Sequence, residues 1–237
     1  MSIDFTIITV AFNSAATIQD TINSVEKQVG VSVQHIVKDG CSTDQTQEIV
    51  RKNKHVELIS IRDNGIYHAM NQSIGFISGK YTLFLNSDDQ LCDSKALLRV
   101  KRLFEKYDPV AVACSIRMFG AKNLKEWVLQ EGFQDQSNFT QYPHPAFFLD
   151  SNFLRTKKVI FHEGYKISAD YRMQLELHYL HGASVYCSSD IITRMFDGGI
   201  SNSSLTWKIK GLLECFDANI RVTKSLRISS MIRKILR

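Results

Sequence analysis

The amino-acid sequence predicts an α/β fold with a mostly parallel sheet and helices on both faces. Short apolar and β-branched runs alternate with helix-periodic segments over about the first hundred residues, which is typical of consecutive β-α-β units. Polar side chains follow the strand-like runs, and open parallel sheets bind their ligands beyond the strand ends. The 237 residues are 44% hydrophobic and 22% charged, a composition that can bury one sizeable core.

The elements of the first half follow in chain order. Residues 5–11 form a continuous apolar run, which is typical of a buried strand. Ser14 is expected to cap the next helix, in which residues 18, 22 and 25 are apolar at helical spacing. The same alternation predicts strands over 31–37, 56–61 and 81–85, and helices over 43–53 and 67–78.

The second half is less regular. A helix over 93–107 leads to a strand over 110–116, and residues 120–145 are interpreted as loops and short strands. Ser168 is expected to cap a helix over 169–181. We therefore expect one domain over residues 1–220, with halves at 1–107 and 108–220, and a tail over 221–237.

Composition argues against several protein classes. No apolar run approaches the roughly 20 residues of a membrane-spanning helix. The first residues lack the basic and apolar regions of a signal peptide, so a cytoplasmic protein is expected. The five cysteines are odd in number and form no CxxC pair, which argues against a disulfide framework or a zinc site. No G-x-G-x-x-G opens the first helix, which argues against a dinucleotide oxidoreductase.

The net charge of +5 arises in the tail. Residues 221–237 hold six basic residues and no acidic one, so the rest of the chain is close to neutral and binding of nucleic acid is not expected. If the tail is helical, it has an apolar stripe flanked by cations, which suits an anionic membrane surface. The stripe consists of Ile228, Met231, Ile232 and Ile235. The alternative is a basic helix that packs on the domain or on a second subunit of a homo-oligomer.

The strongest functional signal is an apolar strand that ends in two adjacent carboxylates, FLNSDD over residues 84–89. Asp88 and Asp89 repel each other unless a cation or hydrogen-bond donors compensate. Carboxylate oxygens suit Mg²⁺ or Mn²⁺ that bridges a diphosphate. The alternative is an Asx turn that caps the helix near Asp93.

Seven motifs occur in a fixed order along the chain. They are ITVAFN (8–13), VKDGCSTDQT (37–46), DNGIYHAMN (63–71), GKYTLFLNSDD (79–89), PHPAFF (143–148), ISADY (167–171) and GGIS (198–201). With these motifs the chain resembles a family 2 glycosyltransferase of the GT-A fold, in the subgroup linked to bacterial exopolysaccharide and colanic-acid-type biosynthesis. The resemblance covers residues 5–201. It implies that 1–107 is the nucleotide-sugar-binding half and 108–220 the acceptor-side half.

The resemblance implies a donor site at the strand ends. Asp39 can accept from a uracil imide or a ribose hydroxyl, and Gly40 is expected to supply the positive φ of a tight turn. For Asp39 the alternative is the turn alone, and Asp44 is interpreted as a helix cap. Three further residues line the first strand end, where a base can lie: Thr9, Ala11 and Asn13.

Two further motifs border the donor sugar and its phosphates. Asp63 and Asn71 are the candidates in the third motif, with a glycine turn as the alternative role of Asp63. The family commonly has aspartate where this chain has His68. It also often has Asp-x-Asp where this chain has Asn86, Ser87 and Asp88. Asn86 and Ser87 are therefore assigned to the donor, and the cation to Asp88 and Asp89.

Sugar transfer needs a base that removes the acceptor hydroxyl proton. Asp170 matches the family's base position, with helix capping as its alternative role and Glu163 as the fallback base. His144 lies between two prolines that restrict its backbone, and it is assigned to the catalytic site or to a structural role. The glycines of residues 198–201 are expected to close a loop near the diphosphate.

The predicted function is metal-dependent, inverting transfer of a sugar from a nucleotide-sugar donor, a UDP-hexose being expected. The acceptor is a hydroxyl of a glycan or lipid-linked glycan in surface polysaccharide biosynthesis. One alternative is a catalytically silent module that binds a nucleotide or a partner. The other is a sugar-phosphate nucleotidyltransferase, which is disfavoured because no Gly-rich basic phosphate loop follows the first strand.

Overall fold

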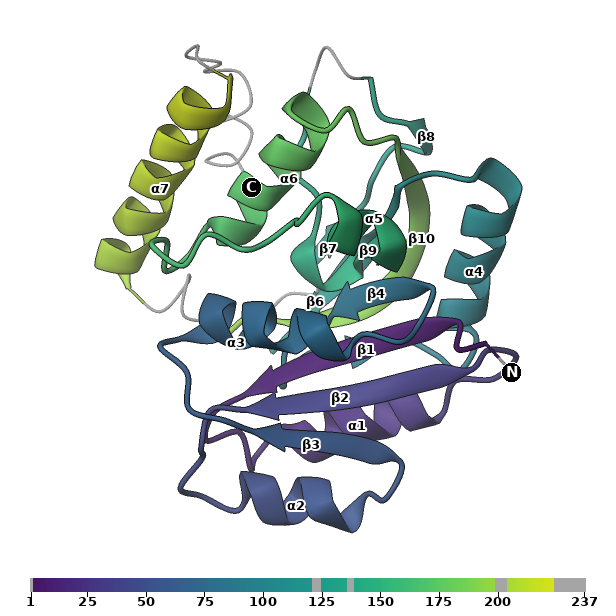
Figure 1. Cartoon of the computed structure of the whole chain (residues 1–237), viewed down its shortest axis with the longest axis vertical. Coiled ribbons are helices and arrows are strands. Elements are labelled where there is room, and N and C mark those ends of the chain that lie inside the picture. Colours follow the sequence, from purple (N-terminus) through teal and green to yellow (C-terminus); the bar gives the residue numbers. More distant parts are fainter. Residues whose placement is uncertain (1, 121–124, 136–138, 199–203, 224–237) are drawn as a thin grey trace.

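The computed structural model describes residues 2–120, 125–135, 139–198 and 204–223. Within those ranges a ten-stranded mixed sheet forms the centre of the molecule (Figure 1). Its strands are β1 (Phe5–Ala11), β2 (Val33–Asp39), β3 (Val56–Ser60), β4 (Tyr81–Phe84), β5 (Gln90–Leu91), β6 (Ala111–Phe119), β7 (Lys125–Trp127), β8 (Gly132–Phe133), β9 (Phe147–Asp150) and β10 (Val185–Phe196). The helices are α1 (Ile18–Glu26), α2 (Thr46–Lys52), α3 (Ile66–Ser73), α4 (Ala96–Tyr107), α5 (Ser151–Thr156), α6 (Ala169–Tyr179) and α7 (Leu205–Thr223), with short 3-10 turns η1 (Ile74–Phe76) and η2 (His144–Ala146).

The N-terminal half of the sheet is parallel. Strand β1 pairs in parallel with β2 and β4, and β2 pairs in parallel with β3. The register sets Ala11 opposite Asp39, so the carboxyl ends of these strands lie at one edge. This confirms the predicted α/β class, and it gathers the polar residues that follow the strands.

Strand β9 makes the sheet mixed. It lies antiparallel between β4 and β6, and β10 then pairs in parallel with β6. Strands β7 and β8 agree with the short strands predicted within residues 120–145. The sequence pattern does not predict β9 or β10, because both are placed by partners far away in the chain.

Both faces of the sheet are covered by helices. Successive side chains of a strand point to opposite faces, and β1 follows this rule. Phe5 and Ile7 pack in the cluster that contains α4, whereas Ile8 and Val10 pack in the cluster that contains α3, α5, α6 and α7. The apolar run of β1 is therefore buried on both sides, as the parallel half of an α/β sheet requires.

Several helix ends differ from the predicted ones. Helix α1 begins at Ile18, and Ser14 does not cap it with its side chain; instead the Ser14 carbonyl accepts the backbone N–H groups of Thr17 and Ile18. Helix α2 begins at Thr46, because the preceding residues form a turn. Helix α3 ends at Ser73, and η1 replaces its last predicted turn.

Helix α7 is a long C-terminal helix that the sequence pattern does not predict. It packs against α6, and it extends to Thr223, so the first three residues of the predicted tail belong to it (Figure 1). Residues 224–237, which hold the predicted apolar stripe of the tail, lie outside the described residues. No helix in the described ranges is both long and apolar enough to cross a membrane.

Candidate active site

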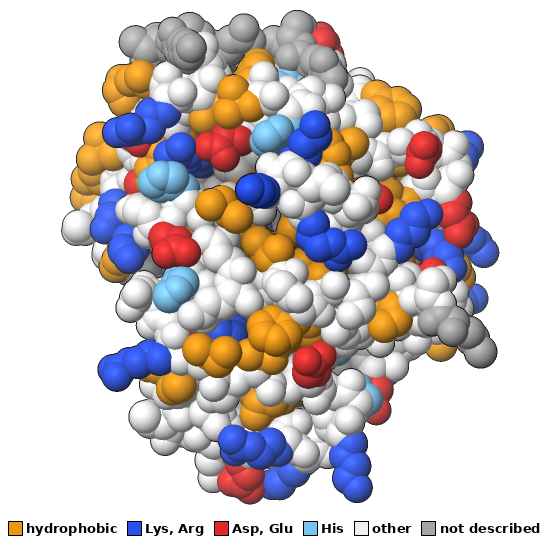
Figure 2. Space-filling view, in the orientation of Figure 1, with side chains coloured by type: hydrophobic (Ala, Val, Ile, Leu, Met, Phe, Trp, Pro, Cys, Tyr) orange, Lys and Arg blue, Asp and Glu red, His pale blue; other side chains and the backbone are white. Residues whose placement is uncertain are grey.

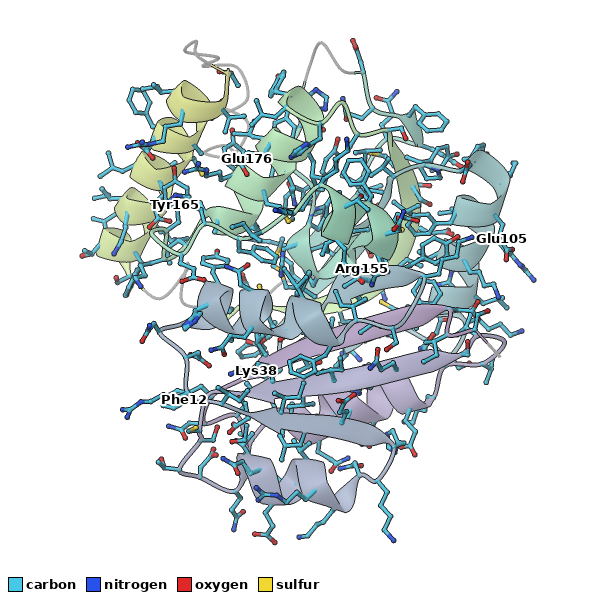
Figure 3. The ribbon with its side chains drawn as sticks, in the orientation of Figure 1. Phe12, Lys38, Glu105, Arg155, Tyr165 and Glu176 are labelled. Carbon is cyan, nitrogen blue, oxygen red and sulfur yellow. The ribbon has the colours of Figure 1, made fainter. Side chains whose placement is uncertain are left out.

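A buried lysine joins the ends of β2 and β3. The Lys38 side chain is fully buried, and its Nζ lies 3.1 Å from Asp63 Oδ2. The same Nζ donates to the backbone carbonyls of Asp39 and Ile61. Burying a charge is costly unless it is paired and hydrogen-bonded, and here both conditions are met. Figure 3 shows Lys38 near Phe12, at the edge where the parallel strands end.

Gly40 serves close packing rather than a left-handed turn. A Cβ on Gly40 would lie 2.7 Å from Asp63 Oδ2 and 3.3 Å from the ring of Phe12, so no larger residue fits under this carboxylate. The positive φ of this turn occurs at Cys41, with φ 65°. The prediction that Gly40 supplies the positive φ was therefore wrong. Position 40 favours glycine for a different reason, which is the close approach of the Asp63 carboxylate.

Asp39 is fully buried, and its carboxylate is saturated by protein donors. Oδ2 accepts from the backbone N–H of Ser42 at 3.0 Å, from Gln47 at 2.8 Å and from Ser60 at 3.1 Å. Oδ1 accepts from the Ser42 hydroxyl. These contacts give Asp39 the turn-fixing role, and a contact with a donor nucleotide remains a prediction.

The loop after β1 is fastened to the loop after β2. Asn13 adopts a positive φ of 52°, and its Oδ1 accepts the Thr43 backbone N–H at 2.9 Å. Asp44 accepts the backbone N–H groups of Ala15 and Thr46, so its contacts join the two loops, although the N-cap residue of α2 is Gln45 rather than Asp44. The hydrogen bond from Thr46 lowers the pKa of Asp44.

The loops after β1 and β4 are also joined. Ser87 Oγ donates to Ser14 Oγ at 2.8 Å, so this candidate donor-binding residue already has a partner within the protein. Thr9 points into the core, where its Oγ1 lies 3.0 Å from His35 Nε2, and burial lowers the pKa of His35 to about 3. We therefore expect Thr9 and Ala11 to contact a donor only through the backbone atoms of β1.

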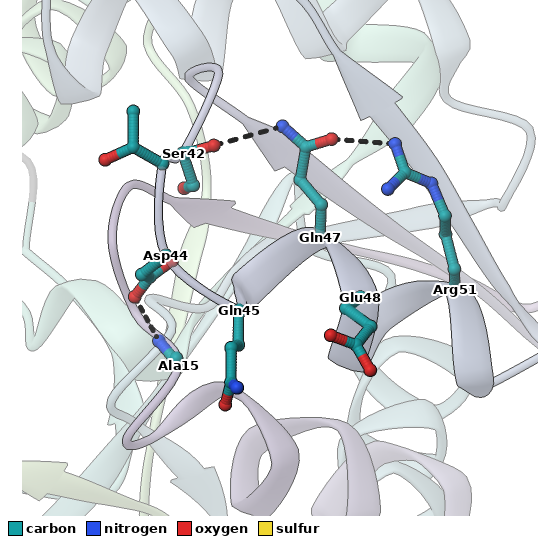
Figure 4. A pocket seen from close by; sticks show the side chains of 8 residues that line it. Ala15, Ser42, Asp44, Gln45, Gln47, Glu48 and Arg51 are labelled. Atoms are coloured by element: carbon teal, nitrogen blue, oxygen red, sulfur yellow. Dashed lines mark hydrogen bonds between the residues drawn. The ribbon is translucent and has the colours of Figure 1, made fainter.

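A surface pocket of about 620 Å³ lies beside these loops (Figure 4). It is lined by Ala15, Ser42, Thr43, Asp44, Gln45, Gln47, Glu48 and Arg51. Gln47 connects its two sides, because it bonds Ser42 and accepts from Arg51 at 2.7 Å. The lining includes neither Asp88 nor Asp170, so the pocket borders the candidate site without containing its reactive groups.

The carboxylates after β4 are poorly compensated. Asp89 is 1% exposed; its Oδ1 accepts the Phe196 backbone N–H at 3.1 Å, whereas its Oδ2 has no hydrogen-bond partner among the described residues. Burial, and then the charge of Asp88, raise the pKa of Asp89 well above its usual value, while the nearby Asn86 side chain opposes this shift. Burial also raises the pKa of Asp88, which is half-buried. Within the described part of the chain, Asn86 Oδ1 is a second buried oxygen without a hydrogen-bond partner.

These oxygens suit a divalent cation. Oxygens of Asp88, Asp89 and Asn86 are hard ligands of the kind that Mg²⁺ and Mn²⁺ prefer. The described residues contain no group of three or more acidic, histidine or cysteine side chains that could hold a metal alone. A cation at this strand end would therefore need further ligands, and diphosphate oxygens meet that need.

Of the predicted loop over residues 198–201, only Gly198 lies within the described residues. A Cβ on Gly198 would lie 2.2 Å from the ring of Phe196, the residue whose backbone N–H donates to Asp89. The loop therefore starts beside the buried carboxylate.

An aromatic cluster connects β4 with residues 144–161. Phe161 contacts three other rings: it stacks on Tyr67 at 5.7 Å, packs edge-on against Phe84 at 4.9 Å and lies 6.0 Å from His144. Asn71 fixes the backbone of Phe161 through both its N–H and its carbonyl, each at 2.8 Å. Phe161 is not among the candidate residues predicted from the sequence.

Asn71 also holds the fallback base. Its Nδ2 donates to Glu163 Oε1 at 2.9 Å, and Glu163 is exposed. These hydrogen bonds of the Asn71 side chain all reach residues 161–163. Asn71 therefore bridges α3 and that segment. Its predicted contact with the donor remains untested.

His68 helps to begin α3. Its Nδ1 accepts the Asn64 backbone N–H at 3.0 Å, and Asp63 Oδ1 accepts the Gly65 N–H at 3.0 Å. Gly65 has a φ of 124°, which only glycine adopts readily. His68 thus supplies a helix-capping contact at the position where aspartate is common in the resembling family.

Asp170 lies near His144 and Tyr67. It occupies the first turn of α6 and is half-buried. Burial lowers the pKa of His144, and the charge of Asp170 opposes that shift. Burial likewise raises the pKa of Tyr67, and the charge of Asp170 adds to the effect. The effect of Asp170 on His144 indicates that these two predicted catalytic groups lie close together. His144 Nε2 is buried and has no hydrogen-bond partner within the described residues.

Glu214 of α7 holds the segment that leads into α6. Its carboxylate accepts the backbone N–H groups of Lys166, Ile167 and Ser168 at 2.8, 2.8 and 2.9 Å. Ser168 occupies the N-cap position, as predicted, but its hydroxyl makes no capping bond within α6 and instead donates to the Gly211 carbonyl at 3.1 Å. The contact with Glu214 comes from a distant helix, and one sequence cannot reveal that partner.

We expect Glu214→Ala to lower the free energy of unfolding by about 2–4 kcal/mol, because it leaves three N–H groups without an acceptor. Glu214→Gln keeps one acceptor oxygen and is expected to cost about half as much. Glu176→Ala is the control, since it removes only one partly exposed ion pair, between side chains that are 25% (Glu176) and 16% (Arg172) exposed, worth about 1 kcal/mol. Urea unfolding measures the free energy of unfolding of all three variants. Equal losses for Glu214→Ala and Glu176→Ala would contradict the stabilising role of the Glu214 carboxylate.

The fold and its polar strand ends define a class: α/β proteins of the GT-A type, in which carboxylates follow the parallel strands of a mixed sheet. The family model described as Glycosyl transferase family 2 matches residues 6–166. The chain therefore belongs to this family.

Solved structures share the fold. Staphylococcus aureus TarS in complex with UDP-GlcNAc superposes with a TM-score of 0.72 at 18% identity, covering 93% of this chain and 67% of that chain. The mannosyltransferase PcManGT of Pyrobaculum calidifontis, in complex with GDP-Man and Mn²⁺, gives 0.71 at 14% identity, covering 95% of this chain and 65% of that chain. These likenesses confirm the GT-A fold.

Curated relatives come from surface polysaccharide biosynthesis. The succinoglycan biosynthesis protein ExoO of Rhizobium meliloti is 30% identical over 193 residues, which are 71% of this chain and 53% of ExoO. The UDP-Glc:alpha-D-GlcNAc-diphosphoundecaprenol beta-1,3-glucosyltransferase WfaP of Escherichia coli is 35% identical over 92 residues, which are 38% of this chain and 37% of WfaP. The chain thus spans about half of ExoO and less of WfaP.

Proposed function

We propose that this chain transfers a hexose from a nucleotide sugar, UDP-linked by preference, to a hydroxyl of a glycan or lipid-linked glycan in surface polysaccharide biosynthesis. Family membership supports the reaction class. The names of WfaP and of the TarS complex support a uridine donor, and the name of WfaP supports a lipid-linked acceptor.

The donor lies across the strand ends in this proposal. The exposed ring of Phe12, at the end of β1, offers a face on which a base can stack. Lys38 holds Asp63 at the neighbouring strand end, where its carboxylate can accept from a ribose or sugar hydroxyl. The diphosphate then reaches Asp88 and Asp89.

Asp88 and Asp89 would hold Mn²⁺ or Mg²⁺, and Asn86 would hydrogen-bond the ribose or a water beside the cation. When bound, such a cation would supply positive charge that stabilises the leaving nucleoside diphosphate. Mn²⁺ in the PcManGT complex supports this choice. The buried Oδ2 of Asp89 is the observation that carries the proposal, since it has no hydrogen-bond partner among the described residues and is available as a cation ligand.

Asp170 accepts the proton of the acceptor hydroxyl as the bond between C1 and the phosphate oxygen breaks. The acceptor attacks C1 from the side opposite the diphosphate, so the configuration at C1 inverts. His144 contacts Asp170 electrostatically, and its neutral imidazole is available to orient the acceptor or a phosphate.

A donor screen tests the proposal. UDP-, GDP- and dTDP-sugars are compared for binding and slow hydrolysis with and without Mn²⁺. We expect one nucleotide series, the uridine one, to bind only when Mn²⁺ is present. Binding without turnover of any donor would favour a silent binding module, an alternative that the departures at Asn86 and His68 keep open. Formation of a nucleotide sugar from a sugar phosphate and a nucleoside triphosphate would favour a nucleotidyltransferase.

A further inference from the structure

The outer face of α7 carries a continuous apolar stripe. Its members are Leu205, Ile209, Leu213, Phe216 and Ile220, which are 74%, 50%, 64%, 40% and 43% exposed. They are spaced by four, four, three and four positions, so they lie on one side of the helix. In Figure 2, hydrophobic and basic side chains gather along the left edge of the molecule, where Figure 1 places α7.

The opposite face fixes the orientation of the helix. Gly211, Glu214, Cys215 and Ala218 are buried, and α7 packs against α6. A Cβ on Gly211 would lie 3.0 Å from Ile167 Cγ2, so the contact is close. With this face held by Glu214 and the loop before α6, the stripe cannot turn inward.

Cations flank the stripe. Lys208 lies on one side of it along the helix, and Lys210 and Arg221 lie on the other, all three exposed. Of the two acidic residues in α7, Glu214 faces inward and Asp217 is bonded by Arg221 and Tyr165. The chain beyond α7 adds five basic residues and no acidic one over residues 224–237.

We propose that this face of α7 docks on an anionic lipid bilayer. The apolar stripe enters the boundary between headgroups and acyl chains, and the flanking cations lie over the anionic headgroups. The helix, with 19 residues, is about 28 Å long, so all five side chains reach a flat surface together.

Charge favours a lipid surface over a second copy of the chain. A symmetric pair presents the same patch from both subunits, so the lysines that flank the stripe would face like charges. An anionic bilayer meets the apolar stripe and the cations at once. The docking face is defined by described residues of α7 alone.

The docking face and the candidate base are linked through one helix. Glu214, on the buried side of α7, holds the backbone of residues 166–168, and Asp170 follows directly in α6. Docking therefore positions the acceptor-side half at the bilayer. This step rests on the proposed function, and it selects a saccharide carried on a membrane lipid as the acceptor class.

Vesicle co-sedimentation of the full chain tests the inference. Phosphatidylcholine vesicles with about 30% phosphatidylglycerol are compared with pure phosphatidylcholine, in the absence of any donor. We expect binding to the anionic vesicles only, weakened by salt. Ile209→Gln combined with Leu213→Gln is expected to weaken it at least tenfold, because burial of two large apolar side chains is lost.

The control makes the same type of substitution at exposed apolar residues outside α7. Val29 and Val128 are 48% and 55% exposed on other surfaces, so Val29→Gln with Val128→Gln should leave vesicle binding unchanged. Lys208→Gln with Lys210→Gln should weaken binding and reduce its dependence on salt. Circular dichroism checks that each variant is folded.

Three results would overturn the inference: no binding of the native chain, equal binding of the native chain and the Ile209/Leu213 variant, or a stripe-dependent dimer in sedimentation velocity without vesicle binding. Because no donor is present, these results are independent of the donor screen. Failure of docking therefore leaves the proposed sugar transfer standing, and the reverse also holds.

Discussion

Asp170→Asn is expected to lower the rate of sugar transfer by about 10²–10⁴-fold while donor and cation affinity stay nearly unchanged, since this is the usual scale of general-base loss. Asparagine keeps the shape of the side chain but cannot accept the acceptor proton at neutral pH. The fold should survive, because Glu214, rather than Asp170, satisfies the backbone N–H groups before α6. Single-turnover transfer and calorimetric donor binding measure the two effects separately.

Glu163→Gln is the matched control for Asp170→Asn. Glu163 is exposed and is held by Asn71, so its amide should retain that position and transfer should stay near the native rate. If Asp170→Asn transfers at the native rate while Glu163→Gln does not, the base is Glu163. Loss of donor affinity in Asp170→Asn would instead show that Asp170 acts on the donor.

Local patterns were sufficient to predict the parallel half of the fold. Strands β1 to β4 and the helices between them follow from apolar runs and helical spacing, because each unit is built from neighbouring residues. Strand β9 could not be found in this way, since it lies between β4 and β6 through pairings with distant segments. Helix α7 was not predicted either. Its outer face is apolar as well as its inner face, which obscures the alternation of apolar and polar residues that indicates a helix.

The places of the motif residues in the fold were predictable, but their contacts were less so. As the motifs predicted, Asp39, Asp63 and Asp89 lie at or after the carboxyl ends of β2, β3 and β4. The partners of these groups were not predictable. Lys38 directly precedes Asp39 in β2, but its ion pair with Asp63 depends on the packing of β2 against β3.

Requirements for particular residue types also arose for unforeseen reasons. Gly40 is needed because the Asp63 carboxylate approaches it closely, whereas the sequence suggested a left-handed turn. Ser168 stands at the N-cap position of α6, yet its hydroxyl donates to the Gly211 carbonyl of α7 instead of capping the helix. In both cases the deciding contact comes from a segment that is distant in sequence, which local rules do not include.

Asp88→Asn and Asp89→Asn are each expected to weaken Mn²⁺-supported donor binding and turnover together, by at least about 100-fold. Loss of an outer partner of a metal ligand already costs about 10–100-fold, and a direct ligand should cost more. Asp89→Asn should also leave the cation-free protein at least as stable as the native one. Burial raises the pKa of Asp89, so its charge is unfavourable without a cation, and asparagine removes that charge.

Thermal unfolding separates these effects. For the native chain, Mn²⁺ with UDP should raise the unfolding temperature, because a ligand that binds only the folded state stabilises it. Both variants should lose this rise while they keep the unfolding temperature of the ligand-free protein. Asp93→Asn is the control, since Asp93 follows the motif closely but forms an exposed ion pair with Arg99, so the rise should remain. If calorimetry finds unchanged, cation-independent donor affinity in both variants, Asp88 and Asp89 do not form a cation site.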